Sequence, residues 1–599
     1  MNGRQELGGL ERAIAATACA LAVACVCSGA RAQTQNAQAG GDAAAASAVY
    51  SQGMQALARR DLAAARAAFE KAVRLAPRSP EAHNSLGWVL MSEGREDAAI
   101  AEFRAALHLR PGFAQAHMNL ANTLEQRGDA QGAVHEAREA VRLAPKDSET
   151  HHVLGRVLSA SGDAGGAVEE LRRAAELEPD RPELHDDYGT ALVLQTKLDE
   201  AAAEFLQALK LQPQFAPAHM HLGVLRLKQN DLVDAEKELR AAVELTPESA
   251  LAHFYLGEAL VSKGSSEEAL EEFRRVAKLD PGNAEAQKEL GILLQRAENA
   301  DEAVGAFERA AKLHPDNPDG HNDLGLALLQ TGDAERAIEE FSAALKSRPD
   351  DAGYEGNLGA AYLQRADFDA AATHFQAAIK LEPQDATFHY DLGLALKMKD
   401  QLGAAIAEFK RAEELDPQLA DAHYTLGVTQ WQQGDLAAAI EELRAAVAAK
   451  PSYAEAYYTL GSVLKQKGDL QPAADALREA IRLQPDFAGA HTNLGGVLRQ
   501  LGDTEGGAAE TKKGLELFKE KSNEQAAAIA TNSGKKLLNA GDLEGAISQF
   551  RNALHALPNS AQAHYELGLA LQRKGSKEEA AREFQRAKEL DARLRTPAP

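Results

Sequence analysis

Histidine is the residue type whose spacing in this 599-residue chain could support chemistry, because imidazole binds metals and titrates near neutral pH. Most histidines stand at one position of a 34-residue period. One imidazole per period places successive rings too far apart to share an ion, whose bonds to nitrogen are about 2 Å long. We therefore predict no metal site and interpret these histidines as packing residues with a polar edge: His83, His117, His151, His185, His219, His253, His321, His389, His423, His491 and His564.

The motifs of common enzyme classes are missing from the sequence. Gly534-Lys535 lacks both the upstream glycine and the following Ser or Thr of a phosphate-binding loop. There is no His-Glu-x-x-His and no Gly-x-Ser-x-Gly, and no segment outside the repeats is long enough for a catalytic domain. We predict that the protein is not an enzyme and has no cofactor.

The elements that must position any site follow the 34-residue period. With Ala46 as position 1, small residues recur at positions 8 and 20, Phe or Leu at position 24, and Pro at position 32. Gly87, Ala99, Phe103 and Pro111 show the pattern in one unit. Small residues let two antiparallel helices approach closely, the large residue fills the space between them, and proline ends the second helix.

This pattern resembles the tetratricopeptide repeat, a helix-turn-helix unit of 34 residues. The resemblance covers residues 46 to about 592 and implies an all-α fold, a right-handed α-solenoid superhelix of about 16 such repeats. In that family, the stacked repeats form an extended concave surface that binds proteins or peptides.

Gly-Asp recurs between the two predicted helices of a repeat. We interpret it as a left-handed helix end followed by the N-cap of the next helix, at Gly128-Asp129, Gly162-Asp163, Gly332-Asp333, Gly434-Asp435, Gly468-Asp469 and Gly502-Asp503.

The period divides the chain into segments. Residues 46–521 form fourteen repeats, of which the last is degenerate, and residues 527–594 form two more. Between them, residues 522–526 are an insertion or hinge, and the charged segment 515–524 predicts an extended helix. Residues 33–45 predict a flexible linker and 595–599 a short tail.

The first 32 residues resemble a secretory signal peptide. Arg4 and Arg12 precede an apolar run that ends in small residues before Gln33. All three cysteines lie in this segment, so a chain cleaved there contains no thiol. We expect export to the periplasm or outside the cell; lipoprotein anchoring at Cys25 is a less favoured alternative.

The family resemblance also places certain first-helix positions on the concave surface. Aromatic rings with polar tips and nearby cations are typical of peptide-binding sites. The alternative is that these rings pack against the next repeat. The predicted groove residues are Tyr390, Tyr424, Tyr458, Trp431, Lys397, Lys465 and Phe254.

A net charge of -24 disfavours nucleic acid and anionic membranes as partners and favours basic proteins, although it also serves solubility. We expect a non-catalytic interaction scaffold of the bacterial cell envelope that binds proteins or peptides in its groove. The alternative is a regulatory or assembly subunit for a separately encoded enzyme or export machine. We also expect no transmembrane span in the mature chain, and self-association through the uncapped C-terminal repeat.

Overall fold

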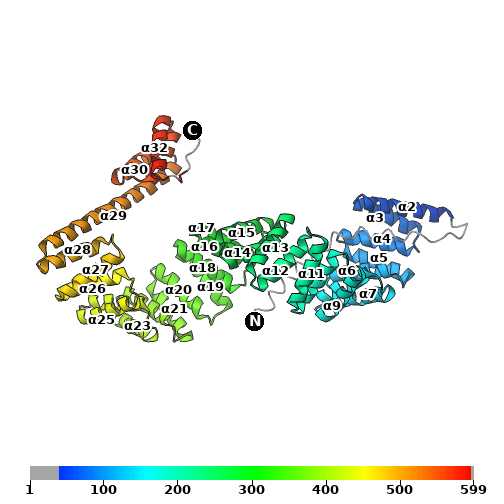
Figure 1. The fold of residues 1–599 in the computed structure, drawn as a ribbon, viewed down its shortest axis with the longest axis horizontal. Coiled ribbons are helices and arrows are strands. Elements are labelled where there is room, and N and C mark those ends of the chain that lie inside the picture. Colours follow the sequence, from blue (N-terminus) through cyan, green and yellow to red (C-terminus); the bar gives the residue numbers. More distant parts are fainter. Residues whose placement is uncertain (1–39, 592, 595–599) are drawn as a thin grey trace. The chain divides into compact units, whose positions relative to one another are not determined.

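The computed structural model describes residues 40–591, 593 and 594. These residues form 31 helices and no strand, which confirms the all-α solenoid fold (Figure 1). The predicted signal peptide, Cys25 and the tail at 595–599 lie outside the described residues.

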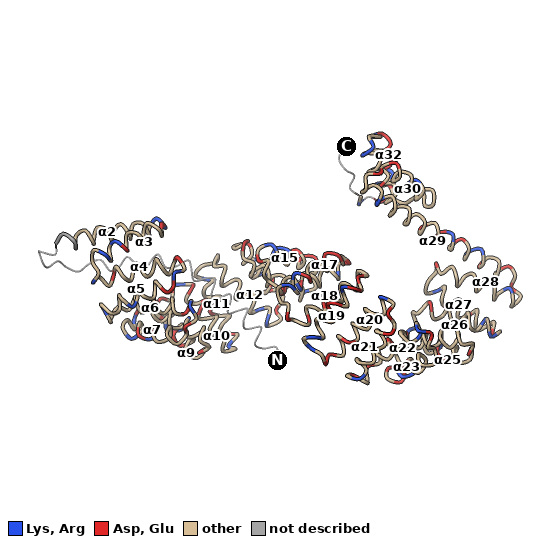
Figure 2. The backbone as a smooth tube through the Cα atoms, turned by 180° about the vertical axis from the view of Figure 1, so that it is seen from behind, with Lys and Arg blue, Asp and Glu red and all other residues tan. Residues whose placement is uncertain are grey.

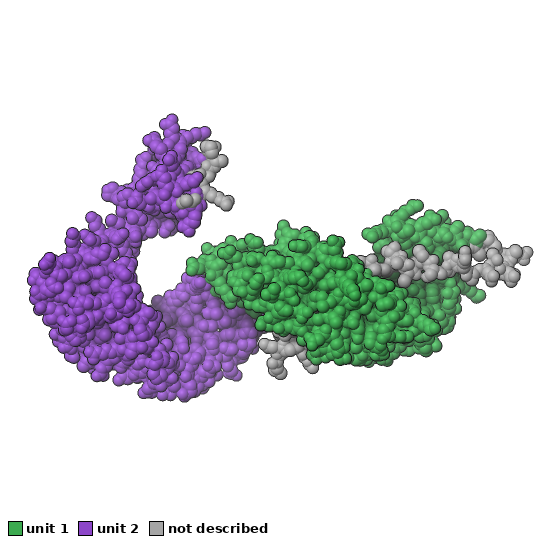
Figure 3. Space-filling view, viewed as in Figure 1, with its two compact units in different colours: residues 1–315 green, residues 316–599 purple. Residues whose placement is uncertain are grey.

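The chain divides into two compact units, Met1–Pro315 and Asp316–Pro599 (Figure 3). In unit 1, consecutive helices pair as the first and second helix of each repeat. Its helices are α2 (Gly40–Ala58), α3 (Leu62–Leu75), α4 (Pro80–Ser92), α5 (Glu96–Leu109), α6 (Ala114–Gln126), α7 (Ala130–Leu143), α8 (Ser148–Ala160), α9 (Ala164–Leu177), α10 (Pro182–Leu194), α11 (Leu198–Leu211), α12 (Ala216–Lys228), α13 (Leu232–Leu245), α14 (Ala250–Lys263), α15 (Ser266–Leu279), α16 (Ala284–Arg296) and α17 (Ala300–Leu313).

Unit 2 continues the same pairing of helices. Its helices are α18 (Pro318–Thr331), α19 (Ala334–Ser347), α20 (Ala352–Gln364), α21 (Phe368–Leu381), α22 (Ala386–Met398), α23 (Leu402–Leu415), α24 (Ala420–Gln432), α25 (Leu436–Ala449), α26 (Ala454–Lys467), α27 (Leu470–Leu483), α28 (Ala488–Gln500), α29 (Thr504–Asn539), α30 (Leu543–Ala556), α31 (Ala561–Lys574) and α32 (Lys577–Leu590).

The glycine at position 8 is what allows the two helices of a repeat to touch. A Cβ atom added at Gly325 would lie 2.6 Å from the ring of Phe341, which is fully buried. The one repeat with alanine at position 8, Ala121, also has alanine at position 24, Ala137, in place of the usual Phe or Leu. A larger residue on one helix is therefore matched by a smaller one on the other.

The Gly-Asp turns adopt the predicted conformation. Gly128 has φ +82°, and the Asp129 carboxylate accepts a hydrogen bond from the Gly132 amide, two residues into the helix from its first residue. Asp469 makes no such bond, because the equivalent residue of its helix is Pro472, which has no amide hydrogen. The turn still forms there, with Gly468 at φ +96°.

The same turn position is left-handed in repeats that have no glycine there. The conformation is sterically unfavourable for these residues, because their Cβ atoms crowd the backbone at positive φ. They are Arg60, Thr196, Asn230, Glu298, Ala366 and Asp400, with φ between 58° and 64°.

Two segments differ in detail from the regular pattern. Helix α2 begins at Gly40, inside the stretch 33–45 for which a linker is expected. Helix α29 runs for 36 residues without a break through 522–526, and serves as the second helix beside α28 and the first helix beside α30 (Figure 1). It exposes the apolar residues Leu515, Phe518 and Ile529.

Acidic and basic side chains are interspersed along the helices of both units (Figure 2). Among the described helices, none combines the length and the apolar composition that crossing a membrane requires.

Candidate functional site

Each regular histidine forms a bridge within its own repeat. His219 Nδ1 lies 2.6 Å from Glu238 Oε2 on the second helix, and Nε2 lies 3.0 Å from the carbonyl oxygen of Pro213 in the preceding loop. The carboxylate stands nineteen residues after the histidine in every such pair. The pairs are His83–Glu102, His117–Glu136, His151–Glu170, His185–Glu204, His219–Glu238, His253–Glu272, His321–Glu340, His389–Glu408, His423–Glu442, His491–Glu510 and His564–Glu583.

The two members of the pair change together. In one repeat they are exchanged, with Glu355 on the first helix and His374 on the second, 2.7 Å apart. Where the first position is neither His nor Glu, the partner carboxylate is missing too, as in Val49/Ala68, Gln287/Ala306 and Tyr457/Ala476. The histidines therefore have a structural role in connecting the two helices, which agrees with their interpretation as packing residues.

At His185 and His219 the bridge favours the protonated imidazole, because a carboxylate and a carbonyl oxygen both accept hydrogen bonds. The hydrogen bond to Glu238 raises the pKa of His219, and that to Glu204 raises the pKa of His185. Glu238 also bonds to Lys237, and the hydrogen bonds from His219 and Lys237 lower its pKa to about 2.

Positions 5 and 6 connect consecutive repeats. In unit 1, Asn119 donates to Asn84 Oδ1 at 3.0 Å. Two further pairs there are charged: His152 Nε2 lies 2.5 Å from Asp187 Oδ2, and His221 Nδ1 lies 2.9 Å from Asp186 Oδ1. Burial opposes the charge on His152, but the hydrogen bond to Asp187 and the nearby carboxylate of Glu149 raise its pKa to about 9. These buried pairs hold α8, α10 and α12 together.

Position 5 in unit 2 carries the predicted groove residues Tyr390, Tyr424 and Tyr458, and Trp431 stands at position 12; all four side chains are partly buried. Tyr390 Oη lies 3.5 Å from Thr425 Oγ1 of the next repeat. The ring centroids of Tyr424 and Tyr453 are 5.1 Å apart, and the Trp431 indole N–H donates to Gln466 Oε1 at 2.7 Å. Each ring thus packs partly against the next repeat while part of it stays accessible.

The other predicted groove residues are divided between the units. Lys465 Nζ lies 3.3 Å from Asn493 Oδ1, and burial lowers the pKa of Lys397. Tyr458 packs on Phe487 with ring centroids 4.7 Å apart. Phe254 belongs to α14 in unit 1, where its ring edge packs on Phe273 at 5.7 Å.

Models of the tetratricopeptide repeat match most of the chain. The matched residues are 50–112, 90–157, 152–216, 189–249, 220–284, 288–352, 357–420, 400–454, 424–484, 458–518 and 531–593. The chain belongs to the tetratricopeptide repeat family. Tetratricopeptide repeats bind protein or peptide partners, so the chain is a protein-interaction scaffold.

Several solved tetratricopeptide structures are similar to this chain. YrrB, described as having an unusual peptide-binding site, is 24% identical and matches 33% of this chain and 99% of its own, with a TM-score of 0.30. Yeast Tom70 is 19% identical over 71% of this chain and 97% of its own, with a TM-score of 0.30. MamA from Desulfovibrio magneticus RS-1 is 26% identical over 28% and 96%, with a TM-score of 0.27. No curated protein sequence matched the chain.

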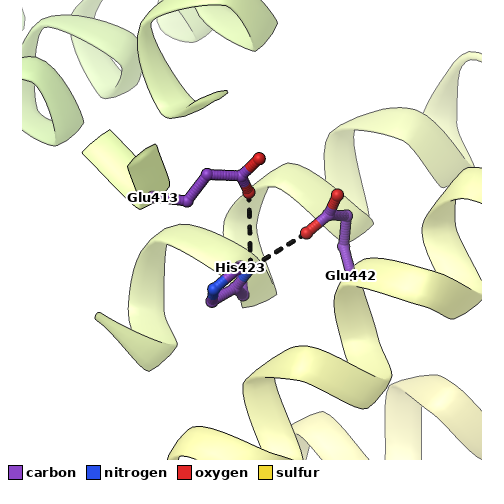
Figure 4. A group of neighbouring side chains, drawn as sticks. All are labelled: Glu413, His423 and Glu442. Atoms are coloured by element: carbon purple, nitrogen blue, oxygen red, sulfur yellow. Dashed lines mark hydrogen bonds and ion pairs between the residues drawn. The ribbon is translucent and has the colours of Figure 1, made fainter. Parts of the chain in front are cut away.

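One tetratricopeptide junction gathers three side chains that could hold a metal ion. A ligand atom of Glu413, one of His423 and one of Glu442 all lie within 4.8 Å of one another (Figure 4). Sequence reasoning missed this group because it considered only pairs of histidines. The available signal was the glutamate nineteen residues after each histidine, together with a charge at position 28 of one repeat.

Proposed function

We propose that this tetratricopeptide protein is a non-catalytic scaffold whose main peptide site is the surface of α22, α24 and α26. The supporting observation is the succession of Tyr390, Tyr424 and Tyr458 at one position of three consecutive repeats, with Trp431 between them. Each ring is partly buried, so it is held in place yet keeps area for a ligand. Rigid aromatic side chains of this kind supply binding energy at low entropic cost.

The charges around the rings favour a peptide that combines apolar and basic residues. Asp421 accepts a hydrogen bond from Tyr453 Oη at 2.7 Å, and burial raises the pKa of Asp391 beside Tyr390 to about 6. Lys397 and Lys465 stand one repeat before and after Trp431, and would contact an acidic group or the terminal carboxylate of the peptide.

Peptide selection tests this site. Peptides selected from a random library on the wild-type chain should bind at least about tenfold more weakly when Tyr390, Tyr424, Tyr458 and Trp431 are replaced by Ala. The matched control replaces Leu206 and Val233, exposed apolar residues on the second helices α11 and α13, by Ala. Equal peptide affinity in the wild type and the four-residue variant, with circular dichroism unchanged, would show that these rings are structural.

We further propose that the scaffold acts in the bacterial cell envelope. The support is the basic, apolar and small-residue pattern of residues 1–32. Fractionation of expressing cells followed by N-terminal sequencing should find the chain outside the cytoplasm and beginning at Gln33. A cytoplasmic chain that retains Met1 or Asn2 would contradict this location.

A further inference from the structure

Position 28 lies on the second helix of a repeat, and one repeat has a carboxylate there. Glu413, on α23, occupies this position. In the other repeats that are followed by another, the residue is apolar: Val73, Leu107, Val141, Ala175, Leu209, Val243, Ala277, Ala311, Leu345, Ile379, Val447, Ile481, Leu515 and Leu554. A charge at a packing position opposes stability unless it is paired or bound, so Glu413 requires an explanation.

Glu413 lies against a histidine pair that already has its own carboxylate. His423 Nδ1 is 2.9 Å from Glu442 Oε2 and 3.3 Å from Glu413 Oε2 (Figure 4). Nδ1 can donate only one hydrogen, which Glu442 takes. Glu413 Oε2 is fully buried and accepts no hydrogen bond.

Two carboxylates this close repel each other. Burial, and then the charge of Glu442, raise the pKa of Glu413 to about 7, against the opposing influence of His423 and Lys410. A cation bound between the carboxylates would remove this repulsion and give the buried oxygen a partner.

The other side of the imidazole is arranged as in metal-binding histidines. His423 Nε2 lies 3.3 Å from the carbonyl oxygen of Pro417. When a metal ion displaces the hydrogen from Nδ1, Nε2–H can still donate to this carbonyl while the Nδ1 lone pair binds the ion. A backbone carbonyl that receives the second ring N–H is a usual partner of a metal-bound histidine, because it fixes the tautomer and the ring orientation.

We propose that Glu413 Oε2, His423 Nδ1 and Glu442 Oε2 bind one divalent first-row metal ion, with Zn²⁺ as the probe of choice. Bonds of about 2.1 Å in tetrahedral geometry separate ligand atoms by about 3.4 Å, close to the 3.3 Å between Glu413 and His423. One nitrogen and two oxygen ligands suit zinc better than magnesium or calcium, which prefer oxygen alone. Water completes the coordination.

The ion would connect two repeats. Glu413 belongs to α23, whereas His423 and Glu442 belong to α24 and α25 of the next repeat. Binding would therefore stiffen the junction between these two repeats. Tyr424, one of the proposed groove residues, directly follows His423 in this junction. This site does not depend on the proposed peptide groove, and either can fail alone.

Zinc titration of the full chain tests the site. Cys19, Cys25 and Cys27 are first replaced by Ser, so that thiolates do not compete. In competition with a chromophoric chelator, this cysteine-free chain should bind one equivalent of Zn²⁺, and the same chain with Glu413→Ile should bind none. Zn²⁺ should raise the Tm of the chain that retains Glu413 and leave the Tm of the Glu413→Ile variant unchanged. Isoleucine is the native residue at Ile379 and Ile481, so the variant should fold.

Three further variants define the result. His423→Tyr combined with Glu442→Ala reproduces the native Tyr457/Ala476 pair, and this variant should also fail to bind the one equivalent of Zn²⁺. Glu408→Gln changes a pair that has only two members, and this variant should bind Zn²⁺ as the parent chain does. Ile481→Glu, beside His491 and Glu510, should add a second equivalent. Equal zinc stoichiometry and affinity in the wild type and Glu413→Ile, or binding of a proton but no zinc, would overturn the proposal.

Discussion

The same two backbone positions carry different chemistry in the two units. At positions 5 and 6, unit 1 has the amide pair Asn84–Asn119 and the buried charged pairs His152–Asp187 and Asp186–His221. Unit 2 has a similar amide pair, Asn357 donating to Asn322 at 2.8 Å, and then three consecutive tyrosines at position 5 in place of charged pairs. The frame of each repeat is nevertheless the same, with glycine at position 8 against a large side chain at position 24.

This difference distinguishes the positions that form the common structure of the repeats from the positions that differ between repeats. Positions 4, 8, 20, 23 and 24 satisfy contacts inside a repeat, so they vary little or vary in pairs. Positions 5 and 6 act between repeats, and a charged, amide or aromatic pair there can each connect neighbouring first helices. The contacts of the charged pairs in unit 1 depend on the ionisation of histidine and aspartate. The aromatic rings in unit 2 form an apolar surface.

Breaking a charged pair should have the largest effect. Asp186→Ala leaves His221 buried without its acceptor, and we expect a loss of about 3 kcal/mol in the stability of unit 1, at the low end for a broken buried pair because imidazole can lose its proton. Urea unfolding followed by circular dichroism measures this loss. Asn322→Ala, the matched neutral pair in unit 2, should cost only about 1 kcal/mol. Equal losses would remove the energetic distinction between charged and amide pairs at these positions.

The shared frame should respond equally in both units. Gly325→Ala in unit 2 and Gly189→Ala in unit 1 place a Cβ atom 2.6 Å and 2.7 Å from Phe341 and Phe205. We expect each to cost about 2 kcal/mol, measured by urea unfolding. Adding Phe341→Ala to Gly325→Ala reproduces the native Ala121/Ala137 pair and should cost less than the sum of the single changes. If the loss of stability in the double variant equalled the sum of the two single losses, the helices would move apart to accommodate the added Cβ atom without strain.

The turns offer a smaller test of the same frame. Thr196→Gly should stabilise unit 1 by about 1 kcal/mol, because a β-branched residue at φ 58° is strained. Asn230→Gly is the control and should gain less, since asparagine tolerates this conformation. Thermal melting of the two variants measures the difference, and a destabilised Thr196→Gly chain would refute the strain.

Alkaline pH should weaken unit 1 more than unit 2. The pKa values of His185 and His219 are raised on folding, and that of His152 is raised to about 9. A histidine whose pKa is raised on folding contributes its full stabilisation at pH values below its pKa in the unfolded chain, about 6.5. This contribution is lost as the pH rises through the pKa of the folded chain. Hydrogen exchange between pH 6.5 and 9.5, corrected for its intrinsic rate, should show α8, α10 and α12 losing protection first. Val and Ala in place of His185 and Glu204, the native Val49/Ala68 combination, should reduce the pH dependence.

The sequence predicted the fold well because the period concerns contacts that each repeat makes with itself. Gly87 and Phe103 could be assigned to a helix contact from their spacing alone, and Asp129 to an N-cap. The exception at Asp469 was also present in the sequence, as Pro472. The start of α2 at Gly40 could not be read from a stretch of Gly, Asp and Ala without periodicity.

The candidate sites were less accessible to sequence reasoning, because they depend on contacts between repeats. Comparing equivalent positions would have shown Glu413 as the charge among apolar residues, but not that it lies 3.3 Å from His423. The groove residues Tyr390, Tyr424 and Tyr458 share a position, yet their packing on Thr425, Tyr453 and Phe487 required coordinates. Their role in binding remains a prediction.

The histidine bridge bears on how such a chain can grow by gene duplication. Both members of each pair lie within one repeat, so a duplicated 34-residue block would inherit a complete bridge, and the reversed order of Glu355 and His374 would be copied with it. The pairs at positions 5 and 6 are divided between neighbouring blocks. Insertion of a block therefore preserves every bridge but separates one such pair, and new recognition chemistry would arise first at the boundaries of inserted blocks.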